Sequence, residues 1–131
     1  MTQEHDIRLA YINTLLDGGY TRLAGGTENP TEGYIVGGVT EPTTMYSTCS
    51  PTPAVHYAQF KKLWHKYDML LHQHTSGKYG GGMGVGTWIH KGQIYFDIVQ
   101  HISDLDVATN VAKERGEIAI YDCTNQKEIL L

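Results

Sequence analysis

The chain has 131 residues, a formal charge of −4 at pH 7 and only two cysteines. This length predicts a single domain over residues 1–131, and the acidic balance argues against broad binding to nucleic acid polymers or anionic membranes. The cysteines predict no disulfide scaffold, and because no signal peptide or membrane-length apolar run is found, we expect an intracellular protein without a membrane partner.

The first expected element is a helix over residues 3–17, ended by two glycines. Its apolar residues surround the helix axis and do not form one stripe. They are Ile7, Leu9, Ala10, Tyr11, Ile12, Leu15 and Leu16. A helix with an apolar circumference needs partners on two sides. Two interpretations stay open: the outer side meets a second subunit in a homodimer or higher homo-oligomer, or the whole helix is buried in one domain.

Two short strands are expected next, over residues 20–24 and 33–39, with a loop rich in turn-forming residues between them. The second strand begins near Tyr34 and runs into Gly37 and Gly38. Because glycine lacks a side chain, the backbone there can approach a ligand closely.

The segment 41–53 contains three prolines and is expected to be irregular. Pro53 suits the first turn of a long helix over residues 53–73, which shows one clear apolar stripe. Residues 75–84 then read as a flexible loop or a lead into a hairpin.

A β-hairpin over residues 85–98 is the clearest local prediction, with Lys91 and Gly92 as its two-residue turn. Side chains alternate between faces along a strand. One face is an apolar core, made of Val85, Thr87, Ile89, Ile94, Phe96 and Ile98. The other face combines aromatic rings, a carboxylate and a glycine: Gly86, Trp88, His90, Tyr95 and Asp97. Such a mixture suits a ligand platform better than a solvated surface.

A capped helix follows, with Ser103 as the expected N-cap and an end near Arg115, where Gly116 tolerates a left-handed conformation. Arg115 lies on the apolar stripe of this helix. It either extends along the surface from the last turn or points at a bound anion. Residues 117–122 alternate as a further strand.

Familiar catalytic and metal motifs are weak in this chain. The glycine run before the hairpin lacks a P-loop lysine and precedes a strand where a phosphate loop would precede a helix. His65, Asp68 and His72 share one helix face, but a solvated face is the simpler interpretation, so neither a metal nor another cofactor is predicted. His90 and His101 could act as acid–base groups, although no nucleophile is recognisable beside them.

Two segments together resemble a known family: NPTEGYIVGG, and TWIHKGQIYFDI followed by the capped helix and GEIAIYD. They resemble the first type of Thoeris anti-defence proteins of phages. The resemblance implies a protein that sequesters cyclised ADP-ribose immune signals in the host cytoplasm without degrading them. It also implies dimers that assemble further, with ligand pockets at subunit interfaces, and in some members separate sites for cyclic oligonucleotides. Residues 42–84 match nothing in that family.

The sequence therefore predicts an α+β fold, an antiparallel sheet with packed helices, and a non-enzymatic sponge for a cyclic nucleotide signal. Trp88 would stack on the base, Arg115 or Arg22 would contact phosphate, and Asp97 would accept from ribose hydroxyls. The expected ligand-binding set is Arg22, Tyr34, Gly37, Trp88, His90, Tyr95, Asp97 and Arg115. One alternative is a small hydrolase of such a signal, using His90, His101 or the His65, Asp68 and His72 face. The other is a phage protein-interaction module without a small ligand.

Overall fold

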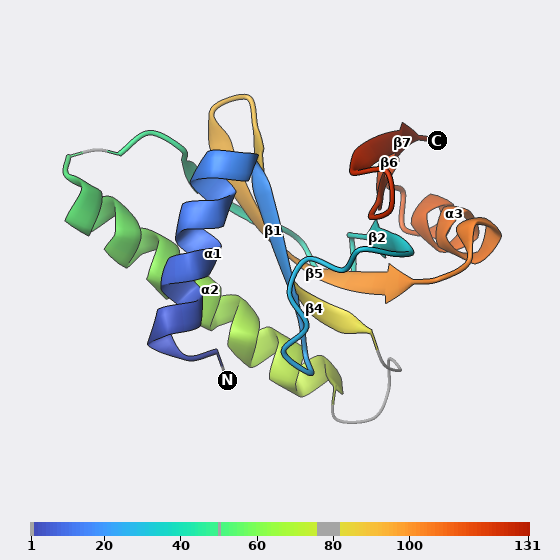
Figure 1. Cartoon of the computed structure of the whole chain (residues 1–131), viewed down its shortest axis with the longest axis horizontal. Coiled ribbons are helices and arrows are strands. Elements are labelled where there is room, and N and C mark those ends of the chain that lie inside the picture. The colour runs from blue at the N-terminus through green and yellow to red at the C-terminus, as the bar shows by residue number, and fades with distance from the viewer. Residues whose placement is uncertain (1, 50, 76–81) are drawn as a thin grey trace.

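The computed structural model describes residues 2–49, 51–75 and 82–131 (Figure 1). In this part of the chain one antiparallel sheet packs against helices, so the predicted α+β class is confirmed. The helices are α1 (Glu4–Asp17), α2 (Pro53–Thr75) and α3 (Leu105–Glu114). The strands are β1 (Gly19–Leu23), β2 (Tyr34–Val36), β3 (Thr43–Tyr46), β4 (Met83–His90), β5 (Gln93–Ile102), β6 (Ala119–Asp122) and β7 (Lys127–Leu130).

Strand β5 is the centre of the sheet, whose order is β1-β4-β5-β2-β6-β7. One edge of β5 pairs with β4 along almost its whole length. The other edge is shared, because β3 pairs with residues 93–96 and β2 pairs with residues 100–102. The chain between β2 and β3 therefore passes the middle of β5, next to Asp97.

The β4–β5 hairpin has the predicted register, with Trp88 opposite Tyr95 and Thr87 opposite Phe96. Its turn residues Lys91 and Gly92 have φ values of 50° and 76°. Two successive positive φ values are those of the tight turn whose twist matches that of the flanking strands. The alternation of side chains between the two faces, predicted from the sequence, is confirmed.

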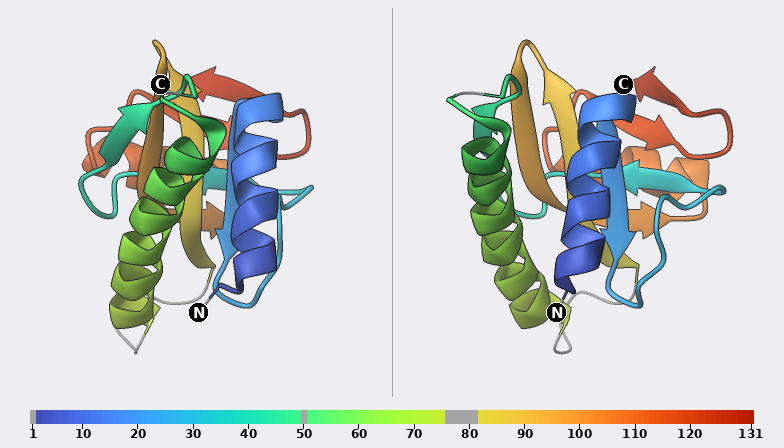
Figure 2. Two further views of the ribbon diagram at one scale, coloured as in Figure 1. Left: turned by 90° about the vertical axis from the view of Figure 1, so that its left-hand side faces the viewer. Right: turned by 60° about the vertical axis from the view of Figure 1, so that its left-hand side comes forward.

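All three helices lie on the same face of the sheet. Helices α1 and α2 lie side by side over one end of the sheet (Figure 2), where Phe60 and Trp64 of α2 pack with the apolar face of the hairpin. Helix α3 covers the other end, where Ala108 and Ala112 pack with Val36. The apolar residues of β5 that face α1 and α2 are fully buried: Ile94, Phe96 and Ile98.

Several boundaries differ from the sequence predictions. Strand β3 lies inside a segment predicted to be irregular, because its pairing with β5 outweighs the nearby prolines, and β7 was not predicted at all. The N-cap of α3 is Asp104, whose carboxylate accepts from the amide of Val107, so the prediction of Ser103 is wrong by one residue. Gly116, with φ 75°, has the predicted left-handed conformation. The loop predicted over residues 75–84 falls largely outside the described residues.

No helix in the described ranges is long and apolar enough to cross a membrane. Helix α1 buries Ile7, Ala10 and Thr14, and leaves Ile12 and Leu16 exposed on its outer side. In the part of the chain that the structure describes, helix α1 is therefore covered on one side only, which contradicts the interpretation that the whole helix is buried in one domain. That its outer side meets a second subunit stays a prediction.

Candidate functional site

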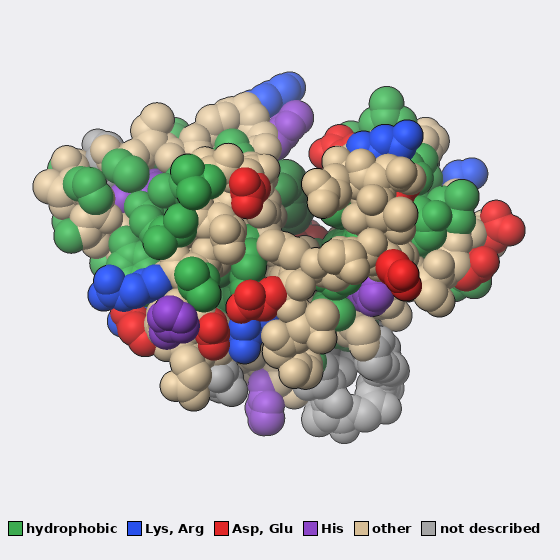
Figure 3. All heavy atoms as spheres, in the orientation of Figure 1, with side chains coloured by type: hydrophobic (Ala, Val, Ile, Leu, Met, Phe, Trp, Pro, Cys, Tyr) green, Lys and Arg blue, Asp and Glu red, His purple; other side chains and the backbone are tan. Residues whose placement is uncertain are grey.

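The face of the sheet that the helices leave open is hollowed into a groove of about 900 Å³. Its floor includes Gly86 and Val99, in the middle of β4 and β5. One wall comes from β1 and the loop after it, and the opposite wall comes from the β6–β7 hairpin. Figure 3 shows a notch between the tip of the β4–β5 hairpin and the β6–β7 hairpin, on the side where the groove opens. A volume of this order is usual for a small-ligand site.

Trp88 lines this groove, with Tyr95 packed against its ring on one side and Gly19 of the neighbouring strand on the other. Tyr95 stacks on the indole with ring centroids 5.2 Å apart and planes 10° from parallel. Across the other strand pair, Trp88 is opposite Gly19, which also lines the groove and has no side chain to cover the ring. His90 lies edge-on to Tyr95 at 6.3 Å and lines the groove as well. The arrangement offers a supported aromatic surface at the groove wall.

Two carboxylates meet beside Gly37, where the chain passes the middle of β5. A side-chain carbon added to Gly37 would lie 2.8 Å from Glu117 Oε1 and 2.9 Å from Asp97 Oδ2. The close approach of these two carboxylates, and not backbone conformation, thus favours glycine at this position. Gly37 and Glu117 line the groove, and Asp97 lies just behind them.

Asp97 is buried, with 1% of its surface exposed, and within the described residues its carboxylate has no cation as a hydrogen-bond partner. Its carboxylate accepts from the amide of Gly38 at 2.8 Å and from the hydroxyl of Thr40 at 3.3 Å. Burial raises the pKa of Asp97 to about 6, against the lowering effect of these bonds, and the negative charge of Glu117 raises it further. Burial also raises the pKa of Glu117, against the opposing effect of Arg115. The pair is suited to holding or exchanging a proton in the range around pH 6 in which Asp97 titrates.

Arg115 connects α3 to this carboxylate pair. Its Nη2 donates to Gln100 Oε1 at 2.6 Å, and its Nη1 is 3.4 Å from the carbonyl oxygen of Gly37. Burial lowers the pKa of Arg115, and the charges of Asp97 and Glu117 oppose that effect. The guanidinium thus supports the groove from behind and already contacts two protein acceptors.

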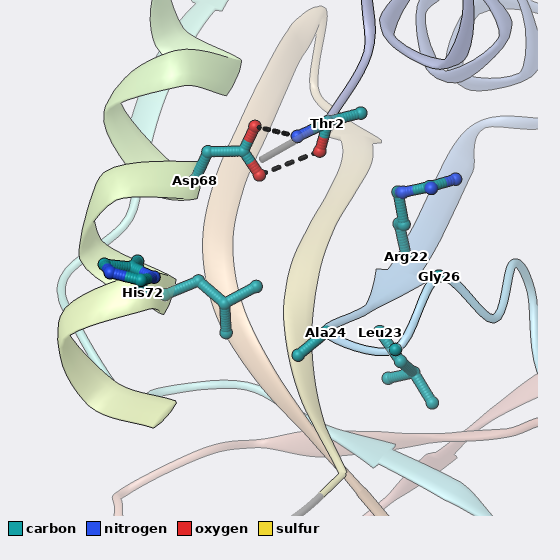
Figure 4. A pocket seen from close by; sticks show the side chains of 9 residues that line it. Thr2, Arg22, Leu23, Ala24, Gly26, Asp68 and His72 are labelled. Carbon is teal, nitrogen blue, oxygen red and sulfur yellow. Dashed lines mark hydrogen bonds between the residues drawn. The ribbon is translucent and has the colours of Figure 1, made fainter. Parts of the chain in front are cut away.

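Two predicted site residues lie away from the groove. Arg22 is on the helix-covered side, in a smaller pocket with Asp68 and His72 (Figure 4), and its guanidinium pairs with Glu28 at 2.9 Å and Asp6 at 3.4 Å. Tyr34 packs against the apolar cluster beneath α3. Of the predicted set, the structure brings Gly37, Trp88 and His90 into the groove and places Tyr95, Asp97 and Arg115 behind it.

Two of the groups considered as metal ligands or acid–base groups, Asp68 and His101, have other hydrogen-bond partners. Within the described side chains, no three histidine, cysteine or carboxylate groups cluster closely enough to hold a metal ion. Asp68 accepts from the amide and the hydroxyl of Thr2 at 3.0 and 2.8 Å (Figure 4). His101 Nε2 donates to the carbonyl of Glu32 at 2.6 Å.

Sequence reasoning missed Glu117 and the groove wall that follows it. Glu117 was placed in a strand without a role, although its position directly after the helix-ending Gly116 marks it as a residue at an element junction. The wall depends on β7, whose four residues carry no strong strand pattern.

Comparison with protein-family models, with curated proteins and with solved structures finds no match to this chain.

Proposed function

We propose that this protein binds and retains a cyclic nucleotide signal in the groove, without cleaving it, and so acts as a sponge. The observation that carries the proposal is the supported ring of Trp88, bordered by Gly19, on the wall of a groove of about 900 Å³. A nucleobase needs such a flat surface, and stacking on an aromatic side chain does not depend on a particular base. The resemblance of the hairpin and the NPTEGYIVGG segment to Thoeris anti-defence proteins supports cyclised ADP-ribose as the ligand class.

Polar groups suited to the sugar lie on the wall opposite β1. Glu117 lines the groove beside the backbone of Gly37, and a carboxylate accepts from ribose hydroxyls. For a pyrophosphate, His90 and Lys127 line the groove and can donate. Arg115 would reach a phosphate only by giving up its bond to Gln100. We therefore assign the phosphate contacts first to the residues that line the groove.

Assembly is the second part of the proposal. The outer side of α1 exposes Leu16 at 77% and Ile12 at 48% of their surfaces. These two residues are four apart and so lie on one helix face. We propose that this face contributes to a homodimer or a higher homo-oligomer in the host cytoplasm. Light scattering at micromolar concentration checks this, and a stable 14.6 kDa monomer would contradict it.

A capture-and-release experiment tests the function directly. Purified protein is incubated with cyclic ADP-ribose isomers and, separately, with cyclic dinucleotides, and the free ligand is measured before and after heat denaturation. We expect depletion of one ligand class followed by release of intact molecules. No depletion of any probe would overturn the sponge proposal and favour a protein-interaction module.

A second candidate, hydrolysis of the bound signal, is favoured by one observation. Asp97 and Glu117 meet beside Gly37, and the pKa of both carboxyl groups is raised. Two adjacent carboxyl groups with raised pKa can hold one proton between them, and such a pair can act as an acid and a base. The same release experiment separates the two functions, because a hydrolase would release an altered product and Glu117→Gln would then restore the intact ligand.

A further inference from the structure

A second chemical cluster lies outside the groove, where α1 meets the start of α2. The thiol of Cys49 is exposed, and its sulfur is 3.6 Å from the hydroxyl of Tyr11 and 3.7 Å from Nδ1 of His56. The Tyr11 hydroxyl is 2.8 Å from the same Nδ1 atom. Three groups that can hold or pass a proton therefore meet at one point, with the sulfur at the outside.

The far side of the imidazole fixes which nitrogen carries the hydrogen. His56 is buried, with 1% of its surface exposed, and its Nε2 is 2.8 Å from the carbonyl oxygen of Tyr46. Because a carbonyl oxygen only accepts hydrogen bonds, Nε2 must be the donor. In the neutral ring Nδ1 then holds a lone pair, to which the Tyr11 hydroxyl donates. The oxygen of Tyr11 is left to accept from the Cys49 thiol.

We propose that Cys49, Tyr11 and His56 form a thiol–disulfide exchange site for a small exposed disulfide. The Cys49 S–H bond breaks as its proton passes to the Tyr11 oxygen while the Tyr11 proton passes to Nδ1 of His56. The sulfur attacks one sulfur of the disulfide, so one S–S bond forms and one breaks. The leaving thiolate then takes a proton back from His56 through Tyr11, and no electron is gained or lost overall.

Disulfide exchange is the reaction that fits this set of groups. It needs a thiolate at the moment of attack and a proton for the leaving thiolate, and a base with a relay supplies both. The carbonyl of Tyr46 accepts from Nε2 and so orients the imidazole with Nδ1 toward Tyr11, as the partner of a catalytic histidine does. Cys123 offers none of this, because it is 2% exposed and burial raises its pKa to about 11. It is an internal control in the same molecule.

The test uses oxidised glutathione as the probe and intact-protein mass with peptide mapping as the readout. At pH 7 we expect one glutathionyl group per chain, on Cys49 and not on Cys123. Tyr11→Phe removes the relay hydroxyl but keeps the ring that packs edge-on against Phe60. We expect it to slow modification of Cys49 by about tenfold or more, since positioned proton transfer commonly contributes factors of that size. His56→Gln is expected to slow it at least as much.

The matched control is Tyr57→Phe, the same chemical change in the same aromatic cluster. The hydroxyl of Tyr57 donates to Glu4 at 3.1 Å, so its loss should leave the rate at Cys49 unchanged. Melting curves of all variants identify any that fail to fold, and Tyr11→Phe decides the proposal if His56→Gln is one of them. A rate in Tyr11→Phe equal to or above that of the wild type would overturn the relay. A reaction confined to Cys123, or absent, would overturn the site.

Discussion

The two faces of strand β5 carry side chains with opposite effects on the stability of the fold. On the helix-covered face, Phe96 is fully buried, and the centroid of its ring lies 4.9 Å from that of the Phe60 ring. On the other face Asp97, the next residue, is almost as buried but carries a carboxyl group whose pKa is about 6. Apolar burial stabilises the fold, whereas burial of a carboxylate without a hydrogen-bonded cation opposes it. Neighbouring residues in one strand thus contribute to stability with opposite signs.

This difference indicates at which positions the fold contains residues that lower its stability. Residues that lower stability at neutral pH are retained where they serve a site, and the rest of the structure compensates. The carboxyl pair beside Gly37 lies on the open face, next to the groove, and the compensating core lies on the helix side. If this comparison is correct, substitutions on the two faces should separate stability from ligand capture.

The largest effect is expected on the covered face. Phe96→Ala should lower the free energy of unfolding by about 3–5 kcal/mol, because it leaves a cavity between β5 and α2. Tyr95→Ala is the matched control, since Tyr95 is the adjacent aromatic residue on the open face and stacks only at the surface on Trp88. Urea denaturation measures both. Equal losses would mean that the two faces do not differ in the way described.

Asp97→Asn should act in the opposite direction. The pKa of Asp97 in the folded protein, about 6, lies above the ordinary value of 3.8, so folding binds a proton between these pH values. The contribution of Asp97 to stability is therefore most favourable below about pH 4 and is lost as the pH rises through 6. An amide cannot ionise and can still accept from Gly38. We expect the variant to gain roughly 1–3 kcal/mol at pH 7.5 and nothing at pH 4.

Asp122→Asn is the control for that sign. Asp122 accepts from the amide of Thr124 and from both the amide and the side chain of Asn125, and these bonds hold its pKa below the ordinary value. Its contribution is present at neutral pH and is lost as the pH falls through its folded pKa. At pH 7.5, Asp97→Asn should thus raise the melting temperature above that of the wild type and Asp122→Asn should lower it, and the deficit of Asp122→Asn should shrink only below about pH 4. A shared direction would refute the assigned environments.

Local signals explain why the β4–β5 hairpin and its two faces could be predicted. The alternation of side chains and the Lys91–Gly92 turn lie within a few residues of one another, and each supports the same register. The end of α1 at Gly18, with φ 83°, is similarly local. The N-cap of α3 was missed by one residue because Ser103 and Asp104 both have side chains suited to capping.

The site could be predicted only in part, because its walls come from distant segments. No pattern in the sequence near β7 predicts that β7 pairs with β6, which in turn pairs with β2. Arg22 was expected at the site by residue type, but the register of β1 opposite Val85 turns it to the helix side. Glu117 reaches Gly37 only because α3 returns the chain to β2. Long-range pairing of this kind leaves no period in the sequence.

On the open face, Trp88→Ala should separate binding from stability. Aromatic stacking on a base is worth about 1–3 kcal/mol, so capture should weaken about tenfold to a hundredfold. The melting temperature should change little, since the apolar cluster lies on the opposite face of the hairpin. Tyr46→Ala is the control, because this aromatic residue is 73% exposed on β3 and does not line the groove. Calorimetric titration with unchanged affinity for Trp88→Ala would place the ligand elsewhere.

Arg115→Ala gives the smallest expected effect and tests a residue that contacts both the helix-covered face and the groove. Its guanidinium donates to Gln100 on the helix side and contacts the carbonyl of Gly37 at the groove. Losing these contacts should lower the free energy of unfolding by about 1–2 kcal/mol.

This loss should be greatest at neutral pH, where Arg115 opposes the combined charge of Asp97 and Glu117, and should shrink toward pH 4 as both carboxyl groups are protonated. Lys113→Ala removes an exposed cation from the same helical turn and should leave stability nearly unchanged. Because the guanidinium already has two protein acceptors, capture should fall less than in Trp88→Ala. A large, salt-sensitive loss of affinity without a loss of stability would instead show that Arg115 points at a bound anion.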